Sequence, residues 1–249
     1  MLKHIQFVNF SMDRRKLRKS NKISLVLPVL NEARTLPAVL EMVSHSDLDE
    51  IIVSDNGSTD NSIKIAMKFA QKDNRIKVTM WSGEQGSGAA RRNGIKHAKG
   101  NVLVFLDADI GGSLKKVPEK LYTPILGGKF DMVMASFNNE GRITELMAKP
   151  LLSIFFPKLA GLKQPLSGLF AIKHEFVFPE KIDDGNAMIG ILLDAYNHGA
   201  RIGEVEIGQL EHCSRDMSMK RQRAEQTGRY FMKRLFEFNK LDKGLKLMN

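Results

Sequence analysis

The stretch NVLVFLDAD, residues 101–109, joins an apolar run to two carboxylates separated by a single alanine, Ala108. The run 102–106 has the length and the apolar content of a strand that is buried on both faces of a parallel sheet. Carboxylates directly after such a strand are costly unless a partner compensates their charge. Asp107 and Asp109 are therefore candidate ligands for Mg²⁺ or Mn²⁺, which prefer hard oxygen donors. Taken in isolation, an Asp-x-Asp motif is also common as a pair of exposed loop acids.

Strand and helix patterns alternate on the N-terminal side of this stretch. The spacing of apolar residues predicts strands over 23–29, 50–54, 76–81 and 101–106, with helices between them over 35–44, 60–72 and 88–98. Repeated strand–helix–strand units predict a mainly parallel sheet with helices on both faces.

The second half of the sequence is less regular. We expect strands over 131–136, 169–173 and 201–207, a broken apolar helix over 143–160, a helix over 186–198 and a basic helix at the C-terminal end. With no internal repeat, we interpret residues 22–214 as one α/β domain. A basic segment over 1–21 precedes it and a basic helix over 215–249 follows it.

Polar clusters follow the first four predicted strands, and the carboxyl ends of parallel strands are where α/β sheets bind ligands. The residues of interest in the first three clusters are Pro28, Asn31 and Glu32, then Asp55, then Gly86, Gly88, Arg91 and Arg92. Glycines let a backbone approach a ligand closely, and an arginine donates charge-assisted hydrogen bonds to phosphate. Together with Asp107 and Asp109, the clusters indicate a site for a nucleoside diphosphate and a metal.

Four motifs in this order resemble those of family 2 glycosyltransferases with the GT-A fold, a Rossmann-like arrangement. They are LPVLNE at 27–32, VSDNGSTD at 53–60, GSGAARRNGI at 86–95 and FLDAD at 105–109. The resemblance implies a donor that is a UDP or GDP sugar. By position, it places Pro28, Asn31, Glu32 and Asp55 along the nucleoside, Arg91 at the phosphates, Asp107 at the ribose or the metal, and Asp109 at the metal. Gly86 and Ala108 are further candidates for binding the nucleotide sugar.

A second resemblance covers residues 164–215. The segments QPLSG at 164–168, GILLD at 190–194 and IGQLEH at 207–212 are similar to glucosyl-3-phosphoglycerate synthases, and SGLFA at 167–171 is similar to polyprenyl-phosphate glycosyltransferases. The resemblance implies that His212 completes the metal site and that Ser167 and Gly168 lie on the acceptor side. It also implies an anionic, phosphorylated acceptor.

Three positions depart from these families. Met188 stands where an acidic residue is expected early in a helix, Leu169 where the phosphoglycerate enzymes have an acid, and Ser214 where they have Asn. Asp184, just upstream of Met188, is a candidate base, although acids at a helix N-terminus are ordinary because they favour the helix dipole. The alternatives are therefore a polyprenyl-phosphate glycosyltransferase or a nucleotide-sugar-binding protein with impaired catalysis.

The charge distribution bears on the partners. Residues 1–22 have seven basic side chains and one acid, residues 215–249 have ten and four, and the whole chain has a net charge of +10. The body is therefore nearly neutral, which argues against nucleic acid. The basic ends are either solvated, or they contact an anionic acceptor or an anionic membrane surface. The apolar residues 154–156 are a candidate lipid-facing surface.

The single cysteine, Cys213, excludes an intrachain disulfide, and no run reaches the roughly 18 apolar residues of a membrane-spanning helix. The first residues also lack the apolar core of a secretory signal. We expect a cytoplasmic protein, peripheral at the membrane if the basic ends contact lipid. The sequence is compatible with a homodimer.

Overall fold

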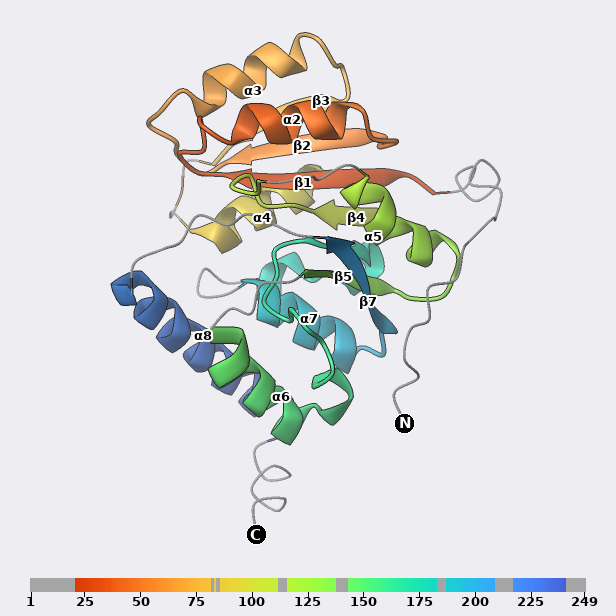
Figure 1. Ribbon diagram of the computed structural model, residues 1–249, viewed down its shortest axis with the longest axis vertical. Helices are drawn as coiled ribbons and strands as arrows, with labels where there is room; N and C mark the ends of the chain where they lie inside the picture. Colours follow the sequence, from red (N-terminus) through yellow and green to blue (C-terminus); the bar gives the residue numbers. More distant parts are fainter. Residues whose placement is uncertain are drawn as a thin grey trace.

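The computed structural model describes residues 21–81, 83, 86–111, 116–137, 143–182, 187–208 and 217–240. Within these residues, seven strands form one sheet in the order β3-β2-β1-β4-β6-β5-β7 (Figure 1). The strands are β1 (Ile23–Val29), β2 (Glu50–Asp55), β3 (Ile76–Met80), β4 (Val102–Phe105), β5 (Met132–Phe137), β6 (Phe170–Lys173) and β7 (Ile202–Gly208). All seven coincide closely with the predicted strands.

The first four strands pair in parallel, as the strand–helix alternation predicts. Strand β6 is the exception, because it runs antiparallel to both of its neighbours, β4 and β5, while β7 pairs in parallel with β5. This reversal matters for the site: the segment that enters β6 lies at the same edge of the sheet as the carboxyl end of β4.

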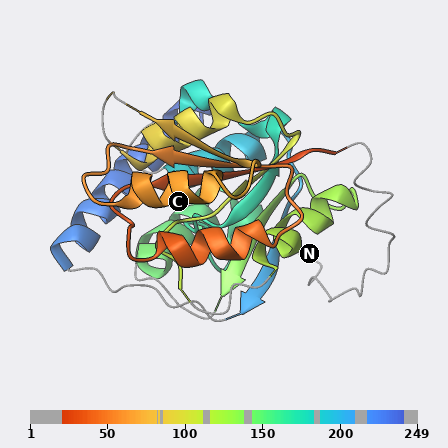
Figure 2. The same ribbon diagram turned by 90° about the horizontal axis from the view of Figure 1, so that it is seen from above.

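Helices cover both faces of the sheet (Figures 1 and 2). One face carries α2 (Leu36–Ser44), α3 (Ser62–Ala70) and α5 (Val117–Leu126), and the other carries α4 (Ser87–His97) and α7 (Ala187–Asn197). Alternate residues of β1 point to opposite sides, so that Leu25 and Leu27 join the core under α2 whereas Val26 joins the core under α4. Two hydrophobic cores thus enclose the sheet.

The predicted broken helix over 143–160 is divided into three segments. A π-helical turn, η1 (Thr144–Ala148), leads into α6 (Lys149–Phe155), and a 3₁₀ turn, η2 (Pro157–Leu159), follows it. Phe156 is fully buried, and Ile154 and Phe155 are half-buried. Phe156 and Phe155 pack against the core, so the prediction of a lipid-facing surface is wrong for Phe156 and stays a prediction for the half-buried Ile154. Two further 3₁₀ turns, η3 (His174–Phe176) and η4 (Pro179–Lys181), follow β6.

The basic C-terminal helix, α8 (Met217–Glu237), packs alongside α6 and α7 (Figure 1). Tyr230, Phe231 and Leu235 are buried in the same core as α7, and the rings of Phe155 and Phe231 have centroids 6.4 Å apart. These three side chains of α8 therefore face the protein core, whereas Met232 and Phe236 are exposed. None of the helices in the described part of the chain has the length and apolar content needed to cross a bilayer.

A buried ion pair joins α7 to α8. Arg234 Nη2 lies 2.8 Å from Asp194 Oδ2, and their side chains are only 3% and 4% exposed. The same nitrogen donates to the Lys181 carbonyl oxygen at 2.5 Å, and the Tyr230 hydroxyl donates to that oxygen at 2.8 Å. Burial raises the pKa of Asp194 to about 6, although Arg234 favours the charged form.

We expect this carboxyl to make the stability of the protein depend on pH. The folded state holds the Asp194 proton more tightly than the unfolded chain does, in which the carboxyl has its ordinary pKa of 3.8. Its stabilising contribution is therefore complete below that value and lost as the pH rises through about 6. The free energy of unfolding should therefore change with pH by about 2 to 3 kcal/mol less when Asp194 is replaced by Asn. Urea unfolding of both proteins between about pH 4 and pH 7 measures it; identical pH profiles would contradict the expectation.

Candidate functional site

Asn31, two residues after β1, forms hydrogen bonds to the loop after β2. It adopts a left-handed backbone conformation with φ 57°, and its amide N–H donates to Ser58 Oγ at 2.9 Å. Its side-chain Oδ1 accepts hydrogen bonds from the backbone N–H groups of Thr59, at 2.8 Å, and Asp60, at 3.3 Å. The side-chain oxygen of Asn31 is thus used within the protein, and it holds the two loops together at the carboxyl edge of the sheet.

Glu32 and Pro28 lie half-buried at the same edge. The backbone N–H of Glu32 donates to Ser62 Oγ at 2.9 Å, and its carboxylate accepts from the Thr35 hydroxyl at 3.0 Å. Pro28 pairs in register with Ser54 of β2. These contacts place Pro28 beside β2 and Glu32 beside the start of α3, and the nucleoside role of both residues stays a prediction.

Asp55 ends β2 and is almost completely buried. Its Oδ2 accepts from the backbone N–H groups of Gly57, at 2.9 Å, and Ser58, at 3.0 Å. Its Oδ1 is buried and has no hydrogen-bond partner within the described residues. Because a buried acceptor without a partner is costly, Asp55 Oδ1 is suited to accept a hydrogen bond from a bound ligand.

Helix α4 directs its N-terminus at this edge. Asn93 anchors it, donating to Ser54 Oγ at 3.1 Å and to Thr79 Oγ1 at 3.0 Å. Gly94 allows the helix to press on β1, because a Cβ there would lie 2.5 Å from Val26 Cγ1. Gly86 precedes the helix, and its carbonyl oxygen accepts from Asn56 Nδ2 at 3.0 Å. The free N–H groups of such a helix start attract phosphate.

Arg91 and Arg92 point to different places. Arg91 is 5% exposed, and its Nη2 donates to Asp107 Oδ1 at 2.8 Å. Arg92 donates to the carbonyl oxygen of Ile182, at the end of η4. Of the two arginines that the sequence offers for phosphate, Arg91 is therefore the one that reaches the acidic motif.

Gly168 lies directly against Asp107. The antiparallel register pairs Phe105 with Phe170, and when it is continued by two residues it places Gly168 opposite Asp107. The two phenylalanine rings stack with centroids 4.4 Å apart, which supports this register. A Cβ on Gly168 would lie 1.9 Å from Asp107 Oδ2, so a larger residue there requires the Asp107 carboxylate to move. The Asp107 carboxylate is thus enclosed between Arg91 and the backbone of Gly168.

The turn before β6 holds Gly168 in place. The backbone N–H of Ser167 donates to the Gln164 carbonyl oxygen at 3.1 Å, and Ser167 Oγ accepts from the Leu169 N–H at 3.1 Å. Ser167 and Gln164 are both buried. The structure therefore brings Gly168 to the acidic motif, with Ser167 directly before it, although nothing adjacent in the sequence indicates that contact.

Asp109 is half-buried two residues beyond Asp107, and Ala108 between them is buried. Within the described ranges, no group of three or more acidic, histidine or cysteine side chains lies close enough to hold a metal ion. His212, Cys213, Ser214 and Asp184 lie outside those ranges. Met188 is buried in the core under α7 and offers no acid or base.

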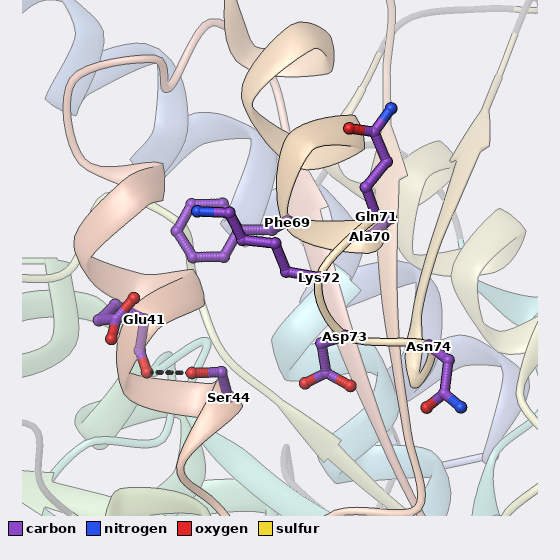
Figure 3. Close-up of a pocket in the computed structure, with 8 residues that line it drawn as sticks. All are labelled: Glu41, Ser44, Phe69, Ala70, Gln71, Lys72, Asp73 and Asn74. Atoms are coloured by element: carbon purple, nitrogen blue, oxygen red, sulfur yellow. Dashed lines mark hydrogen bonds between the residues drawn. The ribbon is translucent and has the colours of Figure 1, made fainter.

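A hollow of about 610 Å³ lies elsewhere, between the C-terminal ends of α2 and α3 (Figure 3). Glu41, Ser44, Lys72 and Asp73 contribute to its lining, and none of the candidate site residues does. Because α2 and α3 run away from the carboxyl ends of β1 and β2, this hollow is at the opposite edge of the sheet. We do not assign it to the site.

The family model described as Glycosyl transferase family 2 matches residues 24–185. A glucosyl-3-phosphoglycerate synthase from Mycobacterium tuberculosis is 29% identical, over 78% of this chain and 68% of the relative. A crystal structure of that enzyme with Mn²⁺, UDP-glucose and phosphoglyceric acid has a TM-score of 0.79 at 28% identity, covering 88% of this chain and 81% of the other. A dolichol-phosphate mannosyltransferase from Pyrococcus furiosus is 29% identical over 63% of this chain and 47% of the relative.

Proposed function

Because the chain belongs to glycosyl transferase family 2 and has the GT-A fold, it is a glycosyltransferase, and we propose that it transfers a hexose from a UDP or GDP sugar to a phosphorylated, phosphoglycerate-like acceptor. The observation that carries this proposal is the enclosure of Asp107. Its carboxylate lies between the Arg91 guanidinium and Gly168, at the sheet edge where Asp55 keeps a free buried oxygen.

The donor would lie across this edge. Asp55 Oδ1 would accept a hydrogen bond from the nucleoside, which supplies the partner that this oxygen otherwise lacks. The diphosphate would lie before the N-terminus of α4, where Gly86 at the N-cap makes no side-chain cap hydrogen bond, because the N–H groups at the start of a helix attract phosphate. Asn31 would act indirectly, since its oxygen is engaged in holding the two loops that form the nucleoside pocket.

A divalent cation fits the donor set. Asp107 and Asp109 offer hard carboxylate oxygens, which suit Mg²⁺ or Mn²⁺, and Mn²⁺ is present in the related enzyme's complex with UDP-glucose. His212 would complete the site, as the resemblance implies. When bound, the cation neutralises the negative charge that grows on the leaving diphosphate.

The chain's own groups would position the reactants. Arg91 would hold Asp107 in one orientation, and Gly168, which lacks a Cβ, would leave the space that the carboxylate occupies in that orientation. Ser167 and Gly168 would border the acceptor, because Gly168 lies next to Asp107 at the carboxyl end of β4 and Ser167 precedes it. Met188 stands at the usual acid position and cannot accept a proton. The acceptor would therefore be one that needs little proton abstraction. An ionised acceptor, or a proton taken by the departing phosphate, meets that condition.

The acceptor class separates two versions of this function. A phosphoglycerate-like acceptor agrees with the resemblance over most of the chain, whereas the dolichol-phosphate relative has a lipid phosphate acceptor in its name. A lipid acceptor would require contact with a membrane surface, to which the net positive charge of α8 would contribute. Turnover of polyprenyl phosphate without turnover of phosphoglycerate would favour the second version, and donor binding without any turnover would favour an impaired binding protein.

The test combines donor cleavage with one substitution. We expect Mn²⁺-dependent release of UDP or GDP from its hexose derivative, accelerated by 3-phosphoglycerate, and we expect Asp109→Ala to lower that rate by about 100-fold or more. Glu225→Ala is the matched control, because Glu225 is exposed on α8 and pairs only with Arg229 among the described contacts. The proposal is wrong if neutral sugars accept the hexose while phosphorylated acceptors do not, or if Asp109→Ala cleaves the donor at the rate of the unmodified protein.

A further inference from the structure

Glu204 lies in the middle of the edge strand β7 and reaches to the turn that carries Gly168. Its Oε1 accepts hydrogen bonds from the backbone N–H groups of Lys163, at 2.7 Å, and Gln164, at 3.3 Å. We propose that Glu204 is a positioning residue that holds the turn 163–168, so that Gly168 keeps Asp107 oriented for the cation and the donor. This inference rests on the proposed function.

A continuous series of contacts links Glu204 to the acidic motif. Glu204 fixes the N–H of Gln164, whose carbonyl oxygen accepts from the Ser167 N–H at 3.1 Å. Gly168 follows and contacts the Asp107 carboxylate, with no space for even a methyl group between them. The other end of the turn is fixed by β6, since Leu169 accepts from the Ala135 N–H of β5 at 2.9 Å. A turn held at both ends transmits a displacement at Gln164 to Gly168.

Burying the Glu204 carboxylate costs free energy, which also indicates that it has a specific structural role. Burial raises the pKa of its carboxyl above the ordinary value, although Lys163 and Lys149 favour the charged form. A carboxylate in such a place is unfavourable for stability unless its oxygens satisfy donors. The donors that it satisfies are the backbone N–H groups of Lys163 and Gln164, at the start of the turn 163–168. The effect of removing it should therefore be local.

The experiment compares Glu204→Ala with Glu204→Gln, which keeps an oxygen that can accept the two N–H groups. Glu206→Ala is the matched control, because it makes the same change two residues along β7 at an exposed side chain. For each protein we would measure UDP (or GDP) affinity by calorimetry without metal, Mn²⁺ affinity in the presence of that nucleotide, and the thermal unfolding midpoint. The Mn²⁺ measurement does not depend on knowing the acceptor.

For Glu204→Ala we expect Mn²⁺ to bind about tenfold more weakly, with metal-free nucleotide affinity within about twofold of the unmodified protein. Glu204→Gln and Glu206→Ala should bind Mn²⁺ like the unmodified protein. Equal Mn²⁺ affinity in all four proteins would overturn the inference about Glu204 and leave the proposed function intact. So would a Glu204→Gln variant as weak as Glu204→Ala, or a parallel loss of metal-free nucleotide binding. If the unmodified protein binds neither nucleotide nor Mn²⁺, the proposed function fails and the inference fails with it.

Discussion

Replacing Gly168 by alanine is expected to lower the rate of metal-dependent donor cleavage by about 100-fold or more, while the protein remains folded. The added Cβ would lie 1.9 Å from Asp107 Oδ2 and 2.3 Å from Oδ1. The atoms that must yield are the end of a side chain, so the carboxylate can rotate away at small cost to the fold. That rotation breaks its 2.8 Å contact with Arg91 and removes it from the edge where the diphosphate would lie.

Steady-state cleavage of the UDP or GDP sugar with Mn²⁺ measures this effect, and the thermal unfolding midpoint shows whether the fold is kept. Gly228→Ala provides the control, because a Cβ there meets Met147 Sδ at an ordinary 3.7 Å. Activity of Gly168→Ala close to that of Gly228→Ala would mean that the orientation of Asp107 is not needed, and the proposed geometry of the site would be wrong.

The elements that position the site could be predicted from the sequence because each is decided by local pattern. The apolar runs of β1, β2 and β4 are nearly continuous, as strands buried on both faces require, and their polar successors had to meet at one edge of a parallel sheet. The sequence analysis did not predict helix α5, because Pro118 and Pro124 within it disfavour a helix in sequence-based reasoning. Pro118 is tolerated in the first turn, and the helix ends two residues after Pro124.

The contacts within the site depend on information that no local pattern contains. Gly168 contacts Asp107 because β6 runs antiparallel to β4. The apolar pattern of a short strand does not show whether it pairs in parallel or antiparallel. Glu204 lies in the alternating segment IGEVEIG, where a glutamate predicts an exposed side chain; only the packing of residues 163–164 against β7 shows its use. Similarly, the two adjacent arginines of α4 are distinguished by helix rotation, which directs Arg91 to Asp107 and Arg92 to η4.

Arg91→Met is expected to lower donor cleavage by about 100-fold, and Arg91→Lys by about tenfold. Arg91 is almost completely buried, and its guanidinium provides the charge-assisted hydrogen bond that holds Asp107. Methionine fills a similar volume but leaves the carboxylate without that donor, whereas lysine keeps the charge without the planar fork. Rates with saturating Mn²⁺ and donor measure the loss, and a lysine variant with full activity would contradict the need for a fork.

A double-substitution cycle determines whether Arg91 acts through Asp107 or on the diphosphate itself. If its role is to orient Asp107, then Arg91→Met should cost little once Asp107 is already Asn, and the double variant should be no more than about threefold slower than the slower single variant. If instead Arg91 binds the phosphates directly, as the family resemblance implies, the two losses should multiply. The 2.8 Å contact between Arg91 Nη2 and Asp107 Oδ1 favours the first outcome, because that nitrogen is directed at the carboxylate. Multiplying losses would assign Arg91 to the donor and leave Gly168 as the residue that orients Asp107.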